Sequence, residues 1–146
     1  MKSYFVRFKN FKEDGTGCLH EQVLKKEGKV LWGQWRNGAS LLNRKTKAEM
    51  NDNAPFILYA LDKNAALIKL TVTNVYDKEE VVAAGLTHLI PSYYTINTPC
   101  SAFYLVSNIE ILPPEAAMSV VNINTNKPIY EAAQVNGATP WRVQVI

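Results

Sequence analysis

Two apolar runs separated by a short polar stretch constrain the fold of this chain more than any other feature. The first run, Phe56–Leu61, consists of apolar residues, and the second, Ala66–Tyr76, is longer and rich in β-branched residues. Asp62–Asn64 between them is typical of a turn. The sequence therefore predicts a β-hairpin over Phe56–Tyr76 at the centre of the chain.

Further strands are predicted on both sides of this hairpin. Leu19, Val23 and Leu24 recur at helical spacing before Gly28, which predicts a short helix over Leu19–Glu27. The other expected strands are Ser3–Phe8, Lys29–Trp35, Ser101–Leu112 and Trp141–Ile146. Ser40–Met50 and Asp77–Thr87 are each expected to be helical or irregular. Glu115–Met118 is expected to form one helical turn, and Ile129–Gln134 is either strand or helix. The sum predicts an α+β domain with five or six strands and two or three helices, arranged as a small closed or half-open sheet.

The length and charge of the chain narrow the classes of protein to consider. Its 146 residues suit one domain spanning 1–146. The net charge of +3 favours anionic partners only mildly. No apolar stretch reaches the roughly 20 residues of a membrane span, and the beginning of the chain does not resemble a signal peptide. Cys18 and Cys100 are far apart, which disfavours a zinc site, so we expect a cytoplasmic protein with unpaired thiols.

Sequence signatures of catalysis are scarce. The two histidines, His20 and His88, belong to no metalloprotease motif, and no serine-hydrolase or phosphate-loop glycine pattern is present. The neighbouring carboxylates Glu79 and Glu80 are typical of a solvated surface pair. The sequence therefore predicts a protein that is not an enzyme, with no catalytic residues, no bound metal and no cofactor.

Aromatic side chains at strand ends and in irregular segments are more informative. These residues are Trp32, Trp35, Tyr93, Tyr94 and Trp141. A flat aromatic face can stack on a nucleobase, and it also attracts methylated, partly cationic groups. Amides such as those of Asn10 and Gln34 can pair with a base edge. Spacing alone leaves two interpretations open for each tryptophan, namely a core residue or the wall of a pocket.

Three stretches of the chain resemble the YTH domain, which reads N6-methyladenine in RNA and belongs to the wider YTH/EVE/PUA-like group of modified-base readers. Residues 4–10 are similar to the family's opening strand, which ends in a base-contacting asparagine. Residues 29–35, followed by Asn37-Gly38 and 41–43, resemble its tryptophan-bearing strand and the helix after it. Residues 102–106, with Leu112-Pro113 and 124–128, are similar to its late strand and Asn-x-x-Lys-Pro segment. The likeness covers nearly the whole chain.

The resemblance implies an aromatic cage for a modified base. Trp32 takes the place of the first cage tryptophan, Asn10 that of the asparagine, and Gly33 offers its backbone to the base. His88 stands where some family members have the second cage tryptophan, and Tyr93 or Tyr94 is the alternative from the same loop. The complete set of expected base-binding residues is Trp32, Asn10, Gly33, Gln34, His88, Leu89, Tyr93 and Tyr94; the expected phosphate-binding residues are Lys9, Arg36, Arg44, Lys45 and Lys47.

The function implied by this resemblance is binding without catalysis. A flipped or unpaired methylated base would enter the cage, with N6-methyladenine favoured and DNA favoured over RNA. The prokaryotic members resemble the specificity modules of McrBC-type restriction systems, so a fused or associated nucleotide-driven motor and nuclease are implied partners, and a membrane is not. The alternatives are an EVE-like reader of 5-methylcytosine and a protein-interaction domain without a base pocket.

Overall fold

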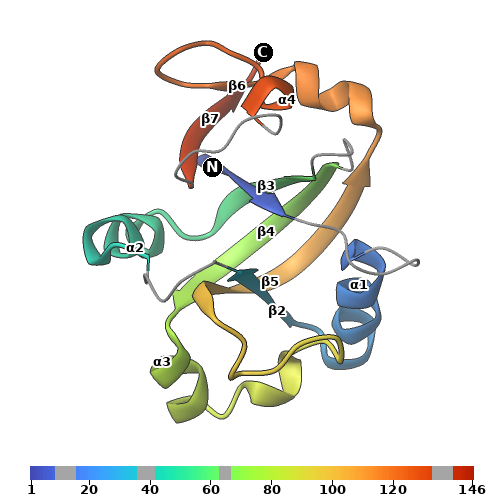
Figure 1. Ribbon diagram of the computed structural model, residues 1–146, viewed down its shortest axis with the longest axis vertical. Coiled ribbons are helices and arrows are strands. Elements are labelled where there is room, and N and C mark those ends of the chain that lie inside the picture. Colours follow the sequence, from blue (N-terminus) through green and yellow to red (C-terminus); the bar gives the residue numbers. More distant parts are fainter. Residues whose placement is uncertain (9–15, 36–41, 63–66, 133–139) are drawn as a thin grey trace.

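The computed structural model describes residues 1–8, 16–35, 42–62, 67–132 and 140–146 (Figure 1). In this part of the chain, seven strands form one mixed sheet in the order β2-β5-β4-β3-β1-β7-β6. The strands are β1 (Ser3–Phe8), β2 (Val30–Trp35), β3 (Phe56–Asp62), β4 (Leu67–Tyr76), β5 (Cys100–Leu112), β6 (Val120–Asn122) and β7 (Trp141–Val145). The α-helices are α1 (Thr16–Glu27), α2 (Arg44–Asp52), α3 (Lys78–Ala83) and α4 (Ile129–Ala132), and the 3-10 helices are η1 (Thr87–Leu89) and η2 (Pro114–Met118).

The central hairpin predicted from the sequence is confirmed. β3 and β4 pair antiparallel, with Phe56 opposite Val72 and Leu61 opposite Leu67. β5 continues the antiparallel pairing along β4, and β1 adds to β3 in parallel. The hairpin therefore lies in the middle of the sheet, where each of its strands has a second neighbour.

The sheet carries apolar side chains on both faces, because helices and loops cover both. One face bears the main core, which includes Trp32, Phe56, Leu70 and Tyr104 together with Met50 of α2 and partly buried residues of α1. The opposite face is covered in two places: by α3, η1 and the segment leading into β5 at one end, and by η2 and α4 at the other. Figure 1 shows these covers at the bottom and the top of the sheet.

Four details of the fold differ from the sequence-based expectation. The sheet has seven strands because residues 120–122 pair with β7, a contact between segments far apart in the chain. The described residues form four α-helices rather than two or three, and residues 129–132 adopt the helical one of the two conformations expected for Ile129–Gln134. α2 begins at Arg44, since the Asn43 side chain accepts a hydrogen bond from the Lys45 backbone amide at 2.8 Å and caps the helix there. The expected closed or half-open sheet is not confirmed, since among the described residues β2 and β6, the two ends of the strand order, do not pair.

None of the helices in the described part of the chain is long and apolar enough to cross a membrane. The longest, α1, has twelve residues and ends with Lys25 and Lys26 in its last turn.

Candidate functional site

An aromatic cluster lies at the free edge of strand β2. Among the described strands, β2 pairs only with β5, so its other edge carries no strand. Trp32 shares the sheet face of Val30, stands opposite Tyr104 of β5 and is only 2% exposed. The indole is thus part of the core in this conformation, and its predicted role as the wall of a base pocket stays a prediction.

His20 covers the Trp32 ring from helix α1. The centroids of the imidazole and indole rings are 4.1 Å apart and their planes differ by 29°, which is a stacked arrangement. His20 is fully buried, whereas every other α1 residue whose side chain is described is exposed or only partly buried. A histidine is therefore the residue that anchors this helix most deeply against the sheet.

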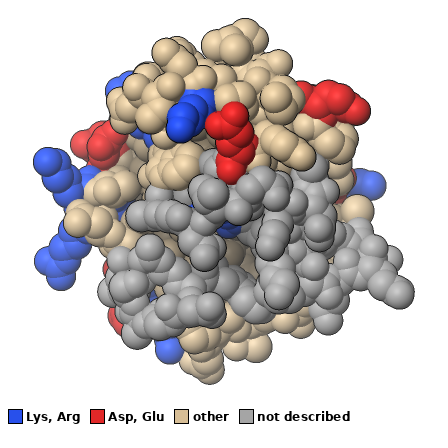
Figure 2. Space-filling view, turned by 45° about the horizontal axis from the view of Figure 1, so that its top comes forward, with Lys and Arg blue, Asp and Glu red and all other residues tan. Residues whose placement is uncertain are grey.

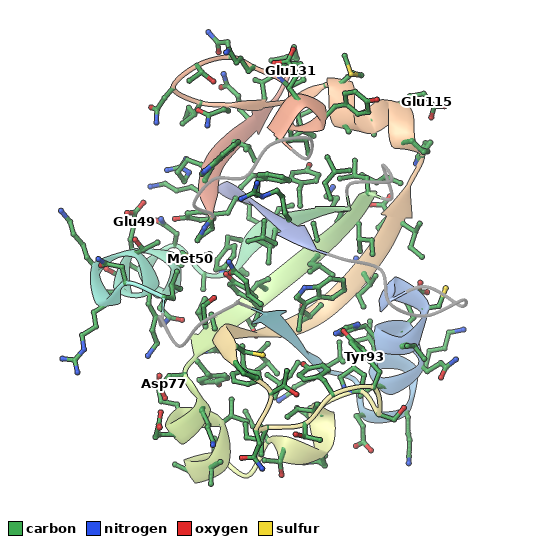
Figure 3. All side chains as sticks on the ribbon, in the orientation of Figure 1. Glu49, Met50, Asp77, Tyr93, Glu115 and Glu131 are labelled. Carbon is green, nitrogen blue, oxygen red and sulfur yellow. The ribbon has the colours of Figure 1, made fainter. Side chains whose placement is uncertain are left out.

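Two consecutive tyrosines complete the cluster from the segment before β5. The Tyr93 ring meets His20 edge to face at 5.7 Å and Tyr94 at 5.0 Å. Figure 3 shows Tyr93 on the segment that leads into β5, beside α1. The His20 ring lies between these tyrosines and Trp32, and the expected role of Tyr93 or Tyr94 as a cage residue stays a prediction.

The Tyr94 hydroxyl binds the polar backbone groups of the β2 edge. It donates a hydrogen bond to the Leu31 carbonyl at 2.9 Å. Burial, with smaller contributions from Tyr93 and Cys100, raises the Tyr94 pKa well above its usual range, and a hydrogen bond from the Gly33 backbone amide opposes this rise. One phenol oxygen thus contacts both a carbonyl and an amide of β2, including the Gly33 backbone expected to contact a base.

Gly33 leaves room for this arrangement because it has no side chain. A Cβ atom built at this position would lie 2.9 Å from Cys100 Sγ and 3.0 Å from Tyr94 Cε2. Contacts this short force neighbouring atoms to move. The glycine therefore permits the close approach of the tyrosine to the strand edge.

The phenol groups of Tyr93 and Tyr94 and the thiol of Cys100 carry no charge at physiological pH. Burial raises the pKa of the Cys100 thiol to about 12, and it also raises the pKa of Tyr93. Both groups remain protonated at pH 7 because their pKa values lie far above it. An apolar and aromatic environment of this kind suits an uncharged flat ring better than an ion.

Gln34 is not presented to solvent. Its side-chain oxygen accepts a hydrogen bond from the Tyr104 hydroxyl, and its backbone carbonyl accepts one from the Ser101 hydroxyl at 3.3 Å. The side chain is 7% exposed because alternation along β2 places it on the same face as Trp32. The amide predicted to pair with a base edge is thus used within the core in this structure.

His88 and Leu89 lie in the 3-10 helix η1. Leu89 is buried with Val81 and Tyr94 under the second sheet face, while His88 is exposed. Among the described residues, the imidazole stacked on Trp32 belongs to His20 and not to His88. Asn10, Lys9 and Arg36 fall outside the described residues.

The remaining predicted phosphate-binding residues lie on α2. Arg44 and Lys45 are exposed, and Figure 2 shows Lys and Arg side chains projecting on the side of the molecule where α2 lies in Figure 1. Lys47 instead forms ion pairs with Asp77, at 3.4 Å, and with Glu80. Arg44 and Lys45 are therefore better placed than Lys47 to meet a phosphate.

A hollow of about 580 Å³ lies between α2 and α3, beside these charges. Arg44 and Lys47 line it on the α2 side, and Asp77, Glu79 and Glu80 line it on the α3 side. Burial lowers the Lys47 pKa, but the carboxylates of Glu80 and Asp77 outweigh this effect and raise the pKa overall. The hollow thus combines both signs of charge, and the aromatic cluster does not line it.

His20 is the residue that sequence reasoning missed. Its position could have indicated it, because His20, Val23 and Leu24 recur at helical spacing and so share the inward face of α1. The stack on Trp32 depends on how α1 packs against the β2 edge, which local spacing does not specify. Among the described residues, no cluster of three metal-binding side chains occurs.

Comparison with known proteins identifies a family. A family model described as Pua-like matches residues 4–135. No curated protein and no solved structure matches the chain significantly.

Proposed function

The chain belongs to the Pua-like family, whose model covers residues 4–135, and on this premise we propose that it binds nucleic acid and reads a methylated base. PUA-like domains commonly bind nucleic acids. The proposed ligand is N6-methyladenine, in DNA rather than RNA, presented as a flipped or unpaired base. The proposed setting is the specificity module of a modification-dependent restriction or defence system, with a motor and nuclease as partners.

The observation that carries this proposal is the concentration of flat rings at one sheet edge. Trp32, His20, Tyr93 and Tyr94 come from three separate segments and make successive ring contacts. Stacking on one aromatic ring contributes roughly 1–3 kcal/mol per base. A methyl group on the base adds apolar surface that the surroundings of these rings favour over water.

Exposed cations on α2 support nucleic acid as the partner. Arg44 and Lys45 of α2 are exposed cations that would hold phosphates while the rings hold the base. Charges of both signs are interspersed on the face seen in Figure 2, so the proposed affinity depends on the base as well as on the backbone.

A protein-interaction domain without a base pocket is the second candidate. The observation that favours it is the 2% exposure of Trp32, since a purely structural tryptophan would look the same. An EVE-like preference for 5-methylcytosine is a variant of the first candidate, because a stacked pocket accepts any flat base and edge contacts decide among them.

A panel of matched oligonucleotides tests the proposal. DNA and RNA, single- and double-stranded, would carry adenine, N6-methyladenine, cytosine or 5-methylcytosine at one fixed salt concentration. We expect tighter binding to N6-methyladenine than to adenine. Equal, weak and salt-sensitive binding to all of them would favour the interaction domain.

A pair of matched variants locates the base. Trp32→Phe keeps an apolar ring at the proposed site, and Trp141→Phe makes the same change where Trp141 packs on Phe5, with ring centroids 5.4 Å apart. We expect Trp32→Phe to reduce the preference for the methylated base and Trp141→Phe to leave it intact. A loss of preference in both variants would point to general destabilisation rather than to a site at Trp32.

A further inference from the structure

The stack between His20 and Trp32 leaves no space for a base. Rings in van der Waals contact lie about 3.5–4.0 Å apart, so a base held between two rings needs them about 7 Å apart. The observed centroid separation is 4.1 Å. A base can therefore contact this face of the indole only if the imidazole leaves it.

The surroundings of His20 resemble those expected for a bound heteroaromatic ring. The imidazole is fully buried, stacks on Trp32 and meets the edge of Tyr93. Beside it, the Tyr94 hydroxyl donates to the Leu31 carbonyl and accepts from the Gly33 amide. These two hydrogen bonds hold Tyr94 in place beside the ring that stacks on Trp32.

Helix α1 is attached to the sheet in a way that allows this exchange. Val23 and Leu24 are only partly buried against the main core, and His20 is the one buried residue among the α1 side chains that the structure describes. No other described side chain of α1 is fully buried and would have to leave the core with the imidazole. Segments with few buried apolar contacts open at low free-energy cost.

We propose that His20 is an internal competitor of the base, occupying the stacking position on Trp32 until a nucleobase displaces it together with the first turns of α1. This inference rests on the proposed function and adds its regulation. It makes His20 a residue that sets affinity, because every binding event must first break the stack. It also explains how a buried tryptophan can belong to a binding site.

Three variants test the competition by their affinity for the oligonucleotide that the wild type prefers, at one salt concentration. His20→Ala removes the competing ring, and we expect about three- to tenfold tighter binding, the equivalent of one aromatic pair. His20→Phe keeps an apolar ring on Trp32 that does not leave readily, so binding should weaken. Gln22→Ala changes an exposed residue of the same helix and should bind as the wild type does.

Fluorescence provides a measurement that does not depend on nucleic acid. We expect acrylamide to quench His20→Ala more than the wild type, because Trp32 becomes accessible. In a Trp32→Phe background the same substitution should produce no such increase. Unchanged quenching in folded His20→Ala would contradict the idea that the imidazole shields this indole.

The outcomes separate the two proposals. If the wild type prefers a methylated base but folded His20→Ala binds it equally or more weakly, the competition is overturned and the proposed function stands. If neither protein prefers any modified base, both proposals fail. If His20→Ala does not fold, His20→Phe is the deciding variant. Weaker binding by His20→Phe than by the wild type supports the competition. Binding as tight as that of the wild type, or tighter, overturns it.

Discussion

The aromatic cluster at the β2 edge and the hollow between α2 and α3 are opposite kinds of site. The cluster is aromatic, buried and filled by its own side chains, and the ring centroids of Trp32 and His20 are 4.1 Å apart. The hollow is open, about 580 Å³ in volume, and lined by Arg44, Lys47 and three carboxylates. The clustered rings are thus found where the protein is closed, and the open space is lined mainly by charged and polar residues.

This contrast shows that empty volume and binding chemistry need not coincide. Lys47 forms two ion pairs in the hollow, one with Asp77 and one with Glu80. These three charged groups are therefore already paired within the protein. In the edge cluster, by contrast, the proposed binding requires that the His20 ring leaves Trp32 and a base takes its place. The predictions below test whether the two regions differ in this way, from the largest expected effect to the smallest.

Truncation of Trp32 should have the largest effect on stability. Trp32→Ala removes a 2%-exposed indole from the main core, and losses of about 3–5 kcal/mol are typical for such changes. Chemical denaturation would measure the loss in unfolding free energy. A loss below about 1 kcal/mol would contradict the tight packing of this ring.

A methyl group at Gly33 should disturb the edge cluster specifically. Gly33→Ala places a Cβ 2.9 Å from Cys100 Sγ, and overpacking of this kind costs about 1–3 kcal/mol. Cys100→Ala in the same chain removes that contact and should restore part of the lost unfolding free energy. Strictly additive effects in this double-mutant cycle would show that the two residues do not meet.

Asn51 of α2 lines the hollow and binds strand β4 of the sheet. Its replacement should lower the free energy of unfolding. Its amide accepts from the Val75 backbone N–H at 2.8 Å and donates to the Val75 carbonyl at 3.1 Å. Asn51→Ala leaves both partly buried backbone groups without this partner, at a cost of about 1–2 kcal/mol in unfolding free energy. Asn53→Ala, which loses one bond to the Tyr4 hydroxyl, is a milder comparison. A smaller loss for Asn51→Ala than for Asn53→Ala would argue against the two hydrogen bonds between Asn51 and Val75.

Loss of the charge on Asp77 should have the smallest effect, and it should depend on pH. Burial raises the Asp77 pKa, but hydrogen bonds from Glu80 and the Lys47 charge outweigh this and hold it below its usual value of 3.8. The stabilisation is therefore present above pH 3.8 and is lost as the pH falls through the lower pKa of the folded state.

Asp77→Asn keeps a side chain able to cap α3 and removes only the charge. Its deficit in unfolding free energy should be below about 1 kcal/mol at pH 7, since the pair is partly exposed, and should vanish in strong acid. Denaturation at pH 7, 5 and 3 would measure it. A deficit that grows as the pH falls would contradict the direction of the pKa shift.

Much of the fold could be predicted from the sequence because its central strands are long and apolar. The hairpin of β3 and β4, and the strands β1, β2, β5 and β7, follow from local patterns. β6 escaped prediction because it has three residues and forms only through pairing with β7. Its formation depends on a partner about twenty residues away in the chain rather than on its own composition.

The candidate site was predicted in part, and the reason lies in tertiary packing. Sequence indicated Trp32, Tyr93 and Tyr94, which the structure brings together. It proposed His88 as the stacking histidine, whereas η1 leaves His88 exposed and α1 places His20 on the indole. Periodicity shows which face of α1 points inward, but not which ring of another element that face will meet.

The most direct test of the account is an NMR titration that follows the Trp32 indole N–H, assigned by its absence in Trp32→Phe. An oligonucleotide with N6-methyladenine and its unmethylated match would be added separately at the same salt concentration. We predict that the methylated strand shifts this resonance strongly and that the unmethylated strand shifts it little. Shifts confined to α2 residues such as Arg44 and Lys45, equal for both strands, would contradict a base site at the β2 edge.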